Sequence, residues 1–175
     1  MNDAIKKIGV NFGIILSIVL ILLTVVMYVT DIELFVNTWL GFLRMIIIVV
    51  VGVLATARSK GALQGFMTFK EAFIPYFITI VLGIVAYTLF VMLLFNVIDP
   101  DAKQTVLQLV LENTVKTLQQ FGSDPKMIKE TIKGLKETDS FGVMPQLIGL
   151  GVSIIGYSVI GLIVAVIFRN KRAES

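Results

Sequence analysis

Few side chains in this sequence could carry out chemistry. The chain has 175 residues and contains no cysteine and no histidine. This composition excludes a thiolate metal site, a cysteine nucleophile and a serine–histidine triad, and it removes the commonest general base. Three acids, Asp99, Asp101 and Asp139, could hold a divalent metal ion, but Asp99 and Asp101 are explained more simply as residues at the start of a helix. We therefore expect neither enzyme activity nor a bound cofactor or metal.

Arg44 is the one charged side chain that lies well inside an apolar block. A charge within a membrane span is a candidate functional site. Arg44 follows Trp39 by five residues, and tryptophan is typical of the membrane interface. The side chain could extend to the outer surface or contact a lipid phosphate, or it could bind another ligand or ion. The apolar blocks contain no acid to pair with it, which argues against a proton relay.

A second candidate is the run Thr68-Phe69-Lys70-Glu71-Ala72-Phe73. Thr68 and Glu71 have the spacing of a capping box, in which each side chain accepts a hydrogen bond from the backbone of the other. This pattern predicts the start of a helix. The alternative is a cytoplasmic docking site formed by Lys70, Glu71 and the preceding loop at 61–65.

Small residues recur every fourth position in the first and last apolar blocks. Such rows let two helices approach closely. They could serve packing within the chain or self-association of two copies. The candidate helix-packing residues are Gly9, Gly13 and Ser17 in the first block and Gly149, Ser153, Gly161 and Ala165 in the last.

The composition indicates an integral membrane protein. Hydrophobic residues make up 57% of the chain, charged residues only 15%, and the mean hydropathy is +0.92. A membrane-spanning helix needs about 20 mostly apolar residues, and its backbone must be hydrogen-bonded internally. The sequence therefore predicts an all-α, four-helix membrane bundle. Its predicted spans are residues 8–29, 38–57, 73–97 and 143–168.

Residues 99–140 differ from the rest, because charged residues are frequent there. Asp99-Pro100 and Asp124-Pro125 are both typical starts of a helix. Apolar residues at helical spacing then predict two amphipathic helices, about 101–121 and 125–138, outside the membrane. Their apolar faces could pack on each other, on the membrane surface or on another protein.

The distribution of lysine and arginine predicts the orientation. Basic residues flank the first span, the loop between spans two and three, and the last span, which favours both termini in the cytoplasm. The chain then divides into spans one to three (1–98), an extracytoplasmic insert (99–140), and a fourth span with a basic cytoplasmic tail (141–175). The sequence pI near 9.2 comes largely from these flanks, which fits anionic lipid headgroups better than nucleic acid.

Taken together, these features resemble the DUF4199 family of small four-helix membrane proteins common in Bacteroidetes. The resemblance rests on Lys6-Lys7-Ile8-Gly9 at the first span, Arg58 after the second, the run at 68–73, the charged insert, and a glycine-rich last span closed by Arg169. It would cover nearly the whole chain. It implies the bacterial inner membrane, with residues 99–140 in the periplasm, and it supplies no catalytic residues.

Two functions follow as hypotheses. The first is a non-enzymatic inner-membrane scaffold or accessory subunit of a membrane or envelope complex, which binds a membrane or periplasmic protein or a second copy of itself. The alternative is a protein that binds or transports a lipid or small solute and uses Arg44 as its anion contact. Both have membrane lipid as a partner, and neither involves nucleic acid.

Overall fold

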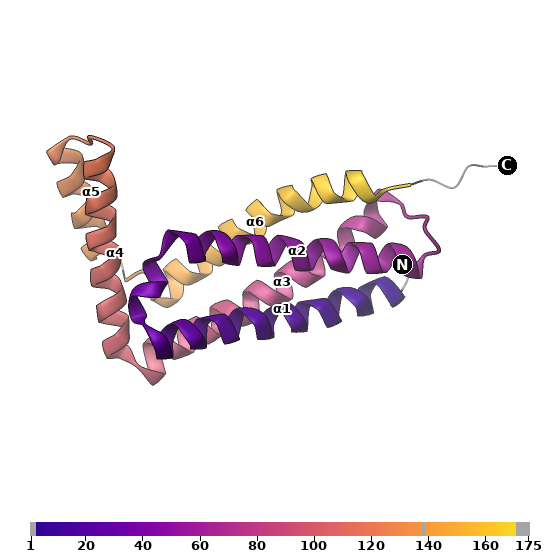
Figure 1. The fold of residues 1–175 in the computed structure, drawn as a ribbon, viewed down its shortest axis with the longest axis horizontal. Coiled ribbons are helices and arrows are strands. Elements are labelled where there is room, and N and C mark those ends of the chain that lie inside the picture. The colour runs from indigo at the N-terminus through magenta and orange to yellow at the C-terminus, as the bar shows by residue number, and fades with distance from the viewer. Residues whose placement is uncertain (1–2, 138, 171–175) are drawn as a thin grey trace.

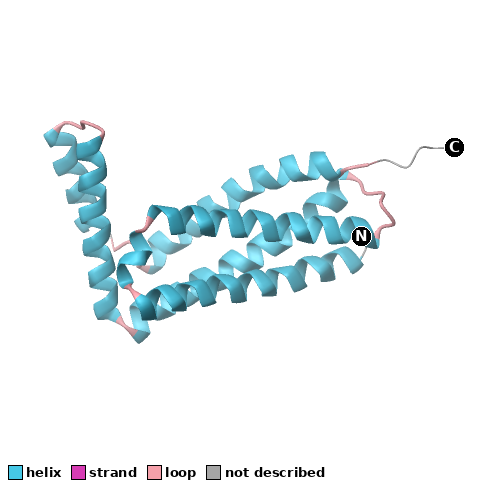
Figure 2. Ribbon diagram, in the orientation of Figure 1, coloured by secondary structure: helices cyan, strands magenta, loops and turns pink. Residues whose placement is uncertain are grey.

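The structure is a computed structural model that describes residues 3–137 and 139–170, and in these ranges it is all-helical (Figure 2). It contains no strand there beyond an isolated bridge between Met67 and Asn170. The predicted all-α class is therefore confirmed. Of the predicted basic tail, Lys171 and Arg172 lie outside the described residues. In chain order the elements are α1 (Asp3–Thr30), the 3₁₀-helix η1 (Ile32–Val36), α2 (Thr38–Ala62), α3 (Phe69–Leu93), the π-helical turn η2 (Leu94–Ile98), α4 (Pro100–Gln120), α5 (Pro125–Glu137) and α6 (Val143–Phe168).

Four helical segments in the described part of the chain are long and apolar enough to cross a membrane: α1, α2, α3 with η2, and α6. They run alongside one another, and α1 begins at the end of the bundle where α6 finishes (Figure 1). The helices extend past the predicted spans at several ends. For example, α1 already begins at Asp3 and includes Lys6 and Lys7, because a helix can continue into water once its charged side chains are solvated.

The centre of the bundle is α3. It packs against α1, α2 and α6, whereas α1 and α6 make no contact with each other in the described residues. Its side chains Tyr76, Ile80 and Ile84 are buried between Leu16 and Leu20 of α1 and partner residues of the other two helices. A helix that is covered on several sides needs apolar residues around most of its circumference, as α3 has.

The α4–α5 hairpin (residues 100–137) runs across one end of the bundle and not along it (Figure 1). Its base is an apolar cluster in which Phe95 is fully buried and Val106 is 2% exposed. The Phe95 ring lies 5.3 Å from the ring of Phe35 and 4.6 Å from that of Phe141, measured between centroids. In the described chain, α5 packs on α4 and on no other helix.

Candidate functional site

The side chain of Arg44 reaches from α2 to α3. Its Nη1 donates a hydrogen bond to the hydroxyl of Tyr87 at 2.5 Å, and its guanidinium carbon lies 5.4 Å from the centre of the Tyr87 ring. Both side chains are half-buried. A guanidinium over an aromatic face gains from the negative charge of the ring face. Arg44 is thus held by a second helix of the bundle.

The positive charge of Arg44 has no carboxylate beside it in the part of the chain that the structure describes. The ion pairs there are Lys6–Asp3, Lys103–Asp139 and Lys133–Glu137. The second phenol near Arg44 is that of Tyr157 on α6, which lies within electrostatic range of Arg44 and packs against the same buried cluster as Tyr87. The three side chains come from three helices and form a cationic, donor-rich group, here called the Arg44 cluster.

A small, partly open cavity adjoins Arg44 and Tyr87 on the side of α1 and η1. Its volume is about 20 Å³, and its walls include Thr24 and Phe35. A single water molecule needs roughly 10–15 Å³ measured in this way, so the cavity matches one water and is too small for a phosphate group. A larger ligand must therefore approach Arg44 from outside the bundle.

Thr68 and Glu71 form the capping box that their spacing predicts. The backbone N–H of Thr68 donates to Oε2 of Glu71 at 2.8 Å, and the backbone N–H of Glu71 donates to Oγ1 of Thr68 at 3.3 Å. The box begins α3. Lys70 lies between the two residues, exposed and outside every ion pair in the described chain.

The capping box makes a direct prediction. Thr68→Ala should lower the free energy of unfolding by about 1 kcal/mol, because it leaves an N-terminal amide of α3 without its acceptor. Thermal unfolding of the purified protein in mild detergent measures the change. Lys70→Ala in the same turn is the control and should have little effect, so equal losses in both variants would contradict a capping role.

The small residues of α1 face α3. A methyl group added at Gly13 would lie 2.8 Å from Cβ of Leu82, and one at Gly9 would lie 3.1 Å from the backbone of Pro75. The hydroxyl of Ser17 donates to the carbonyl of Gly13 at 2.8 Å and to that of Leu82 at 3.3 Å. This row therefore provides the close approach of α1 to α3.

The small residues of α6 divide into two groups. A methyl group added at Gly161 would lie 2.6 Å from Cδ1 of Tyr76, and Ala165 is fully buried. In contrast, a methyl group at Gly149 would meet no atom within 4 Å, and Ser153 is half-buried. The closest packing of α6 thus lies in the half nearer its C-terminal end, although Leu150 in the other half also packs against the core.

The ring of Tyr76 is held between two helices. Opposite Gly161, a methyl group at Gly52 of α2 would lie 2.7 Å from Cε2 of Tyr76. The Tyr76 hydroxyl is the one buried side-chain oxygen or nitrogen without a hydrogen-bond partner in the described residues. Gly52 was not among the predicted packing residues, although it begins a buried row of small residues in α2 that continues through Ala55, Thr56 and Ser59.

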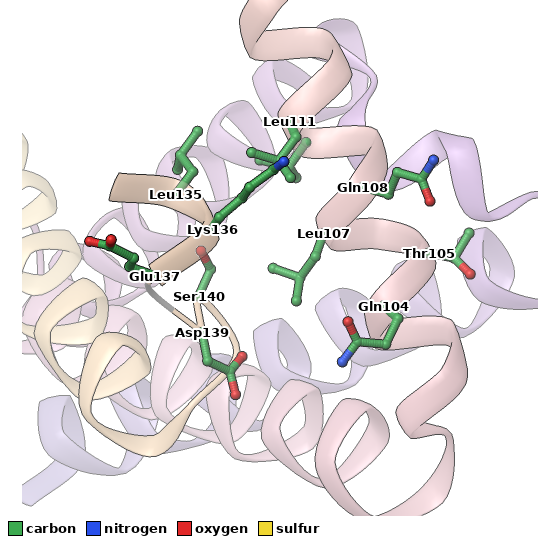
Figure 3. Close-up of a pocket in the computed structure, with 11 residues that line it drawn as sticks. Gln104, Thr105, Leu107, Gln108, Leu111, Leu135, Lys136, Glu137, Asp139 and Ser140 are labelled. Carbon is green, nitrogen blue, oxygen red and sulfur yellow. The ribbon is translucent and has the colours of Figure 1, made fainter. Parts of the chain in front are cut away.

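The hairpin carries a groove of about 550 Å³ between α4 and α5. Figure 3 shows Leu107 and Leu111 of α4 and Leu135 of α5 along it, with the carboxylate of Asp139 toward one end. Asp139 is paired with Lys103. The groove is therefore lined by leucines together with polar side chains, among them Gln104 and Gln108 of α4.

The three acids considered for catalysis do not form a cluster. Asp99 accepts hydrogen bonds from the Tyr28 hydroxyl at 2.6 Å and from the backbone of Ala102 at 2.9 Å, whereas Asp139 pairs with Lys103. In residues 3–137 and 139–170, no group of three or more acids is placed to hold a metal ion. Asp99 acts as the N-cap of α4, as the sequence indicates.

The partners of Arg44 are the part of this site that sequence analysis missed. Tyr87 lies 43 residues from Arg44, and no local pattern connects the two. Comparison with protein families matches residues 11–170 to a model described as protein of unknown function (DUF4199). No curated protein and no solved structure matches the chain.

Proposed function

This chain belongs to the DUF4199 family of proteins of unknown function, and from its geometry we propose that it is a non-enzymatic scaffold or accessory subunit of the bacterial inner membrane. In this proposal the four long apolar helices span the membrane, both termini are cytoplasmic, and the α4–α5 hairpin is presented in the periplasm to a partner protein. The observation that carries the proposal is the mounting of this hairpin, which is fixed at its base and free on its far side.

Polar contacts at three places hold the base of the hairpin to the bundle. Asn113 of α4 donates to the carbonyl of Val36 at 2.9 Å, and Lys103 of α4 donates to Oδ1 of Asn96 at 3.0 Å. Tyr28 of α1 donates to Asp99 at the first turn of α4. With the apolar cluster around Phe95, these contacts support a fixed orientation of the hairpin relative to the bundle.

One exposed side of α5 carries a row of lysines, with the exposed Glu130 and Glu137 beside it. Its lysines recur at helical spacing on one side, and Lys133 alone among them forms an ion pair in the described chain, with Glu137 at 3.8 Å. A row of this kind attracts a surface of opposite charge. We therefore propose a partner protein with an acidic patch. The row consists of Lys126, Lys129, Lys133 and Lys136, all of them exposed.

Site-specific cross-linking tests the docking proposal. A photoreactive amino acid at Lys129, introduced into the full chain in intact cells, should give one discrete adduct of higher mass. The adduct should disappear when Lys126 and Lys133 are both changed to Glu. A photoreactive residue at Lys7, exposed near the start of α1, serves as the control and should not give this adduct. Adducts that are absent, or that persist after the charge reversal, would refute docking through this face.

Cysteine labelling tests the proposed topology independently, because the native chain contains no thiol. Single cysteines at Glu33, Ala62 and Gln120 should be accessible from outside, inside and outside the cell, respectively. A cysteine at Gln120 that is labelled only from the cytoplasm would reverse the proposed orientation.

The attachment of α4 should depend on pH through Asp99. The hydrogen bond from Tyr28, followed by that from the backbone of Ala102, lowers the pKa of Asp99 below its usual range. Because the folded pKa is the lower one, these bonds stabilise the attachment above the ordinary pKa of an aspartate, and this stabilisation is lost as the pH falls through the lowered pKa. The protection of the amides in the first turn of α4, expressed relative to their intrinsic exchange rates at each pH, should therefore fall as the pH drops below about 4.

The variant Asp99→Asn isolates this effect, since an amide does not titrate in this range. The protection of its amides in the first turn of α4 should be lower than in the native chain at neutral pH and should change much less as the pH falls. Asp101→Asn, in the same turn, is the matched control. A pH profile of Asp99→Asn that matches the native one would show that Asp99 is not the titrating group.

A second candidate function is the binding or transport of a lipid or small solute. It is favoured by one observation, the Arg44 cluster, in which a half-buried guanidinium has phenols and no acid around it in the described residues. The native occupancy of lipid on the purified protein, with and without Arg44, tests this candidate.

A further inference from the structure

The donors of the Arg44 cluster outnumber its acceptors. A guanidinium presents a planar fork of N–H donors and accepts no hydrogen bond. In the described structure Arg44 makes one hydrogen bond, from Nη1 to Tyr87. In the described residues, the Tyr76 hydroxyl is the one buried side-chain oxygen or nitrogen that lacks a hydrogen-bond partner. The other nitrogens of Arg44 also lack a partner there, so they cannot be buried. These remaining N–H groups are therefore accessible at the surface of the bundle.

The two tyrosines add hydroxyl donors to the same place. The Tyr87 oxygen accepts from Arg44, and its own proton has no acceptor among the described residues. The Tyr157 hydroxyl also has no hydrogen-bond partner among the described residues, and its oxygen is not fully buried. Each of these hydroxyls can donate to a ligand. Helices α2, α3 and α6 thus each supply a free donor beside one uncompensated positive charge.

We infer that Arg44, Tyr87 and Tyr157 form a binding site for a phosphate oxyanion. The inference rests on the second candidate function and specifies its ligand. Donors left unpaired in apolar surroundings are unfavourable, and a group that only accepts hydrogen bonds and carries negative charge satisfies them. A guanidinium fork binds phosphate with two parallel hydrogen bonds, which are among the strongest in proteins.

The depth of Arg44 favours the phosphate of a membrane lipid as the source. Arg44 lies five residues from Trp39 on the same helix, so the two Cα atoms are about 8 Å apart along the helix axis. The Trp39 side chain is 81% exposed. Side chains on a helix lean toward its N-terminal end, and for α2 this is the Trp39 end. The guanidinium is therefore near the level of the interface, where lipid phosphates lie.

The surroundings leave a way for such a group to enter. Gly41 precedes Arg44 by one helical turn on the same face, is exposed, and a methyl group there would meet no atom within 4 Å. Along α6, no residue from Val143 to Ile160 is fully buried. The acids of the α1–α2 connection, Asp31 and Glu33, line a different groove beside α4 and form no ion pair with Arg44.

Native mass spectrometry of the purified full chain tests the site. Phosphatidylglycerol is added in increasing amounts to the protein in detergent, and its apparent Kd is measured for the native chain and for Arg44→Gln, Tyr87→Phe and Tyr157→Phe. We expect Arg44→Gln to weaken binding by about tenfold or more, and each tyrosine change to weaken it by a smaller factor. Arg44→Lys should restore only part of the affinity, because it keeps the charge without the fork.

Two variants are matched controls. Arg58→Gln removes the other arginine of α2, and Tyr28→Phe removes a tyrosine hydroxyl that already has an acceptor in Asp99. Both should bind phosphatidylglycerol like the native chain. An Arg44→Gln variant that is folded and binds as tightly as Arg58→Gln would overturn the inference. Should Arg44→Gln fail to fold, native-like binding by both Tyr87→Phe and Tyr157→Phe would overturn it.

Competition with inorganic phosphate identifies the source of the oxyanion. Displacement of the lipid by millimolar phosphate, lost in Arg44→Gln, would assign the site to a free anion. Resistance to phosphate, with lipid binding still dependent on Arg44, would assign it to a lipid headgroup. Neither result bears on the cross-link at Lys129, so the inference and the docking proposal can fail separately.

Discussion

Replacing Gly161 with valine is expected to lower the free energy of unfolding by about 3 kcal/mol, near the upper end for an overpacked core. Even a methyl group at this position would lie 2.6 Å from Cδ1 and 2.7 Å from Cε1 of Tyr76. The ring cannot move away, because α2 closes the opposite side at Gly52, where a methyl group would lie 2.7 Å from Cε2. α6 must then separate from α3. Thermal or denaturant unfolding in mild detergent measures the loss.

Gly149→Val is the matched control, on the same helix and with the same change in side chain. Added atoms at Gly149 meet nothing within 4 Å, so this variant should unfold like the native chain. Equal destabilisation of both variants would show that the cost comes from valine in the helix and not from Tyr76. A change of oligomeric state in Gly149→Val alone would assign the open half of α6 to self-association.

Phe95→Ala is expected to cost about 3–5 kcal/mol, the range for deleting a buried aromatic ring. Phe95 is fully buried at the base of the hairpin and contacts the rings of Phe35 and Phe141. Its removal leaves a cavity where the α1–α2 connection, α4 and the segment before α6 meet. Hydrogen exchange should increase first in α4 and η1, because these elements depend on that cluster.

The control for Phe95 is Phe121→Ala at the tip of the hairpin. Phe121 is 83% exposed, so its loss should change stability by less than about 0.5 kcal/mol. If the hairpin must be fixed to dock its partner, Phe95→Ala should also weaken the cross-link at Lys129, whereas Phe121→Ala at the opposite end of α4 should leave the base intact. Uniform faster exchange along the whole chain in Phe95→Ala would contradict a local role.

Local signals predicted much of the helical framework. The Thr68–Glu71 capping box begins α3, and Asp99 followed by proline begins α4, where the sequence places them. Both signals act between residues three or four positions apart, so a single chain segment contains all the information. The family resemblance is likewise confirmed, over residues 11–170.

The environment of Arg44 could not be predicted in the same way. Its type and its position after Trp39 identified it as a candidate, but its partners Tyr87 and Tyr157 come from two other helices. Which faces of α2, α3 and α6 meet depends on how the helices rotate and cross. For the same reason, similar rows of small residues had different outcomes, since Gly161 is packed and Gly149 is open.

The sequence alone determined that this chain forms long apolar helices with a charged helical insert, because these properties follow from composition, periodicity and capping within short segments. The tertiary structure alone decided which side chains face one another. It placed Tyr76 between two glycines, left the hydroxyls of the Arg44 cluster without acceptors, and set the hairpin across the end of the bundle. The physical reason is that side-chain packing between helices selects one arrangement among many that the same local signals allow.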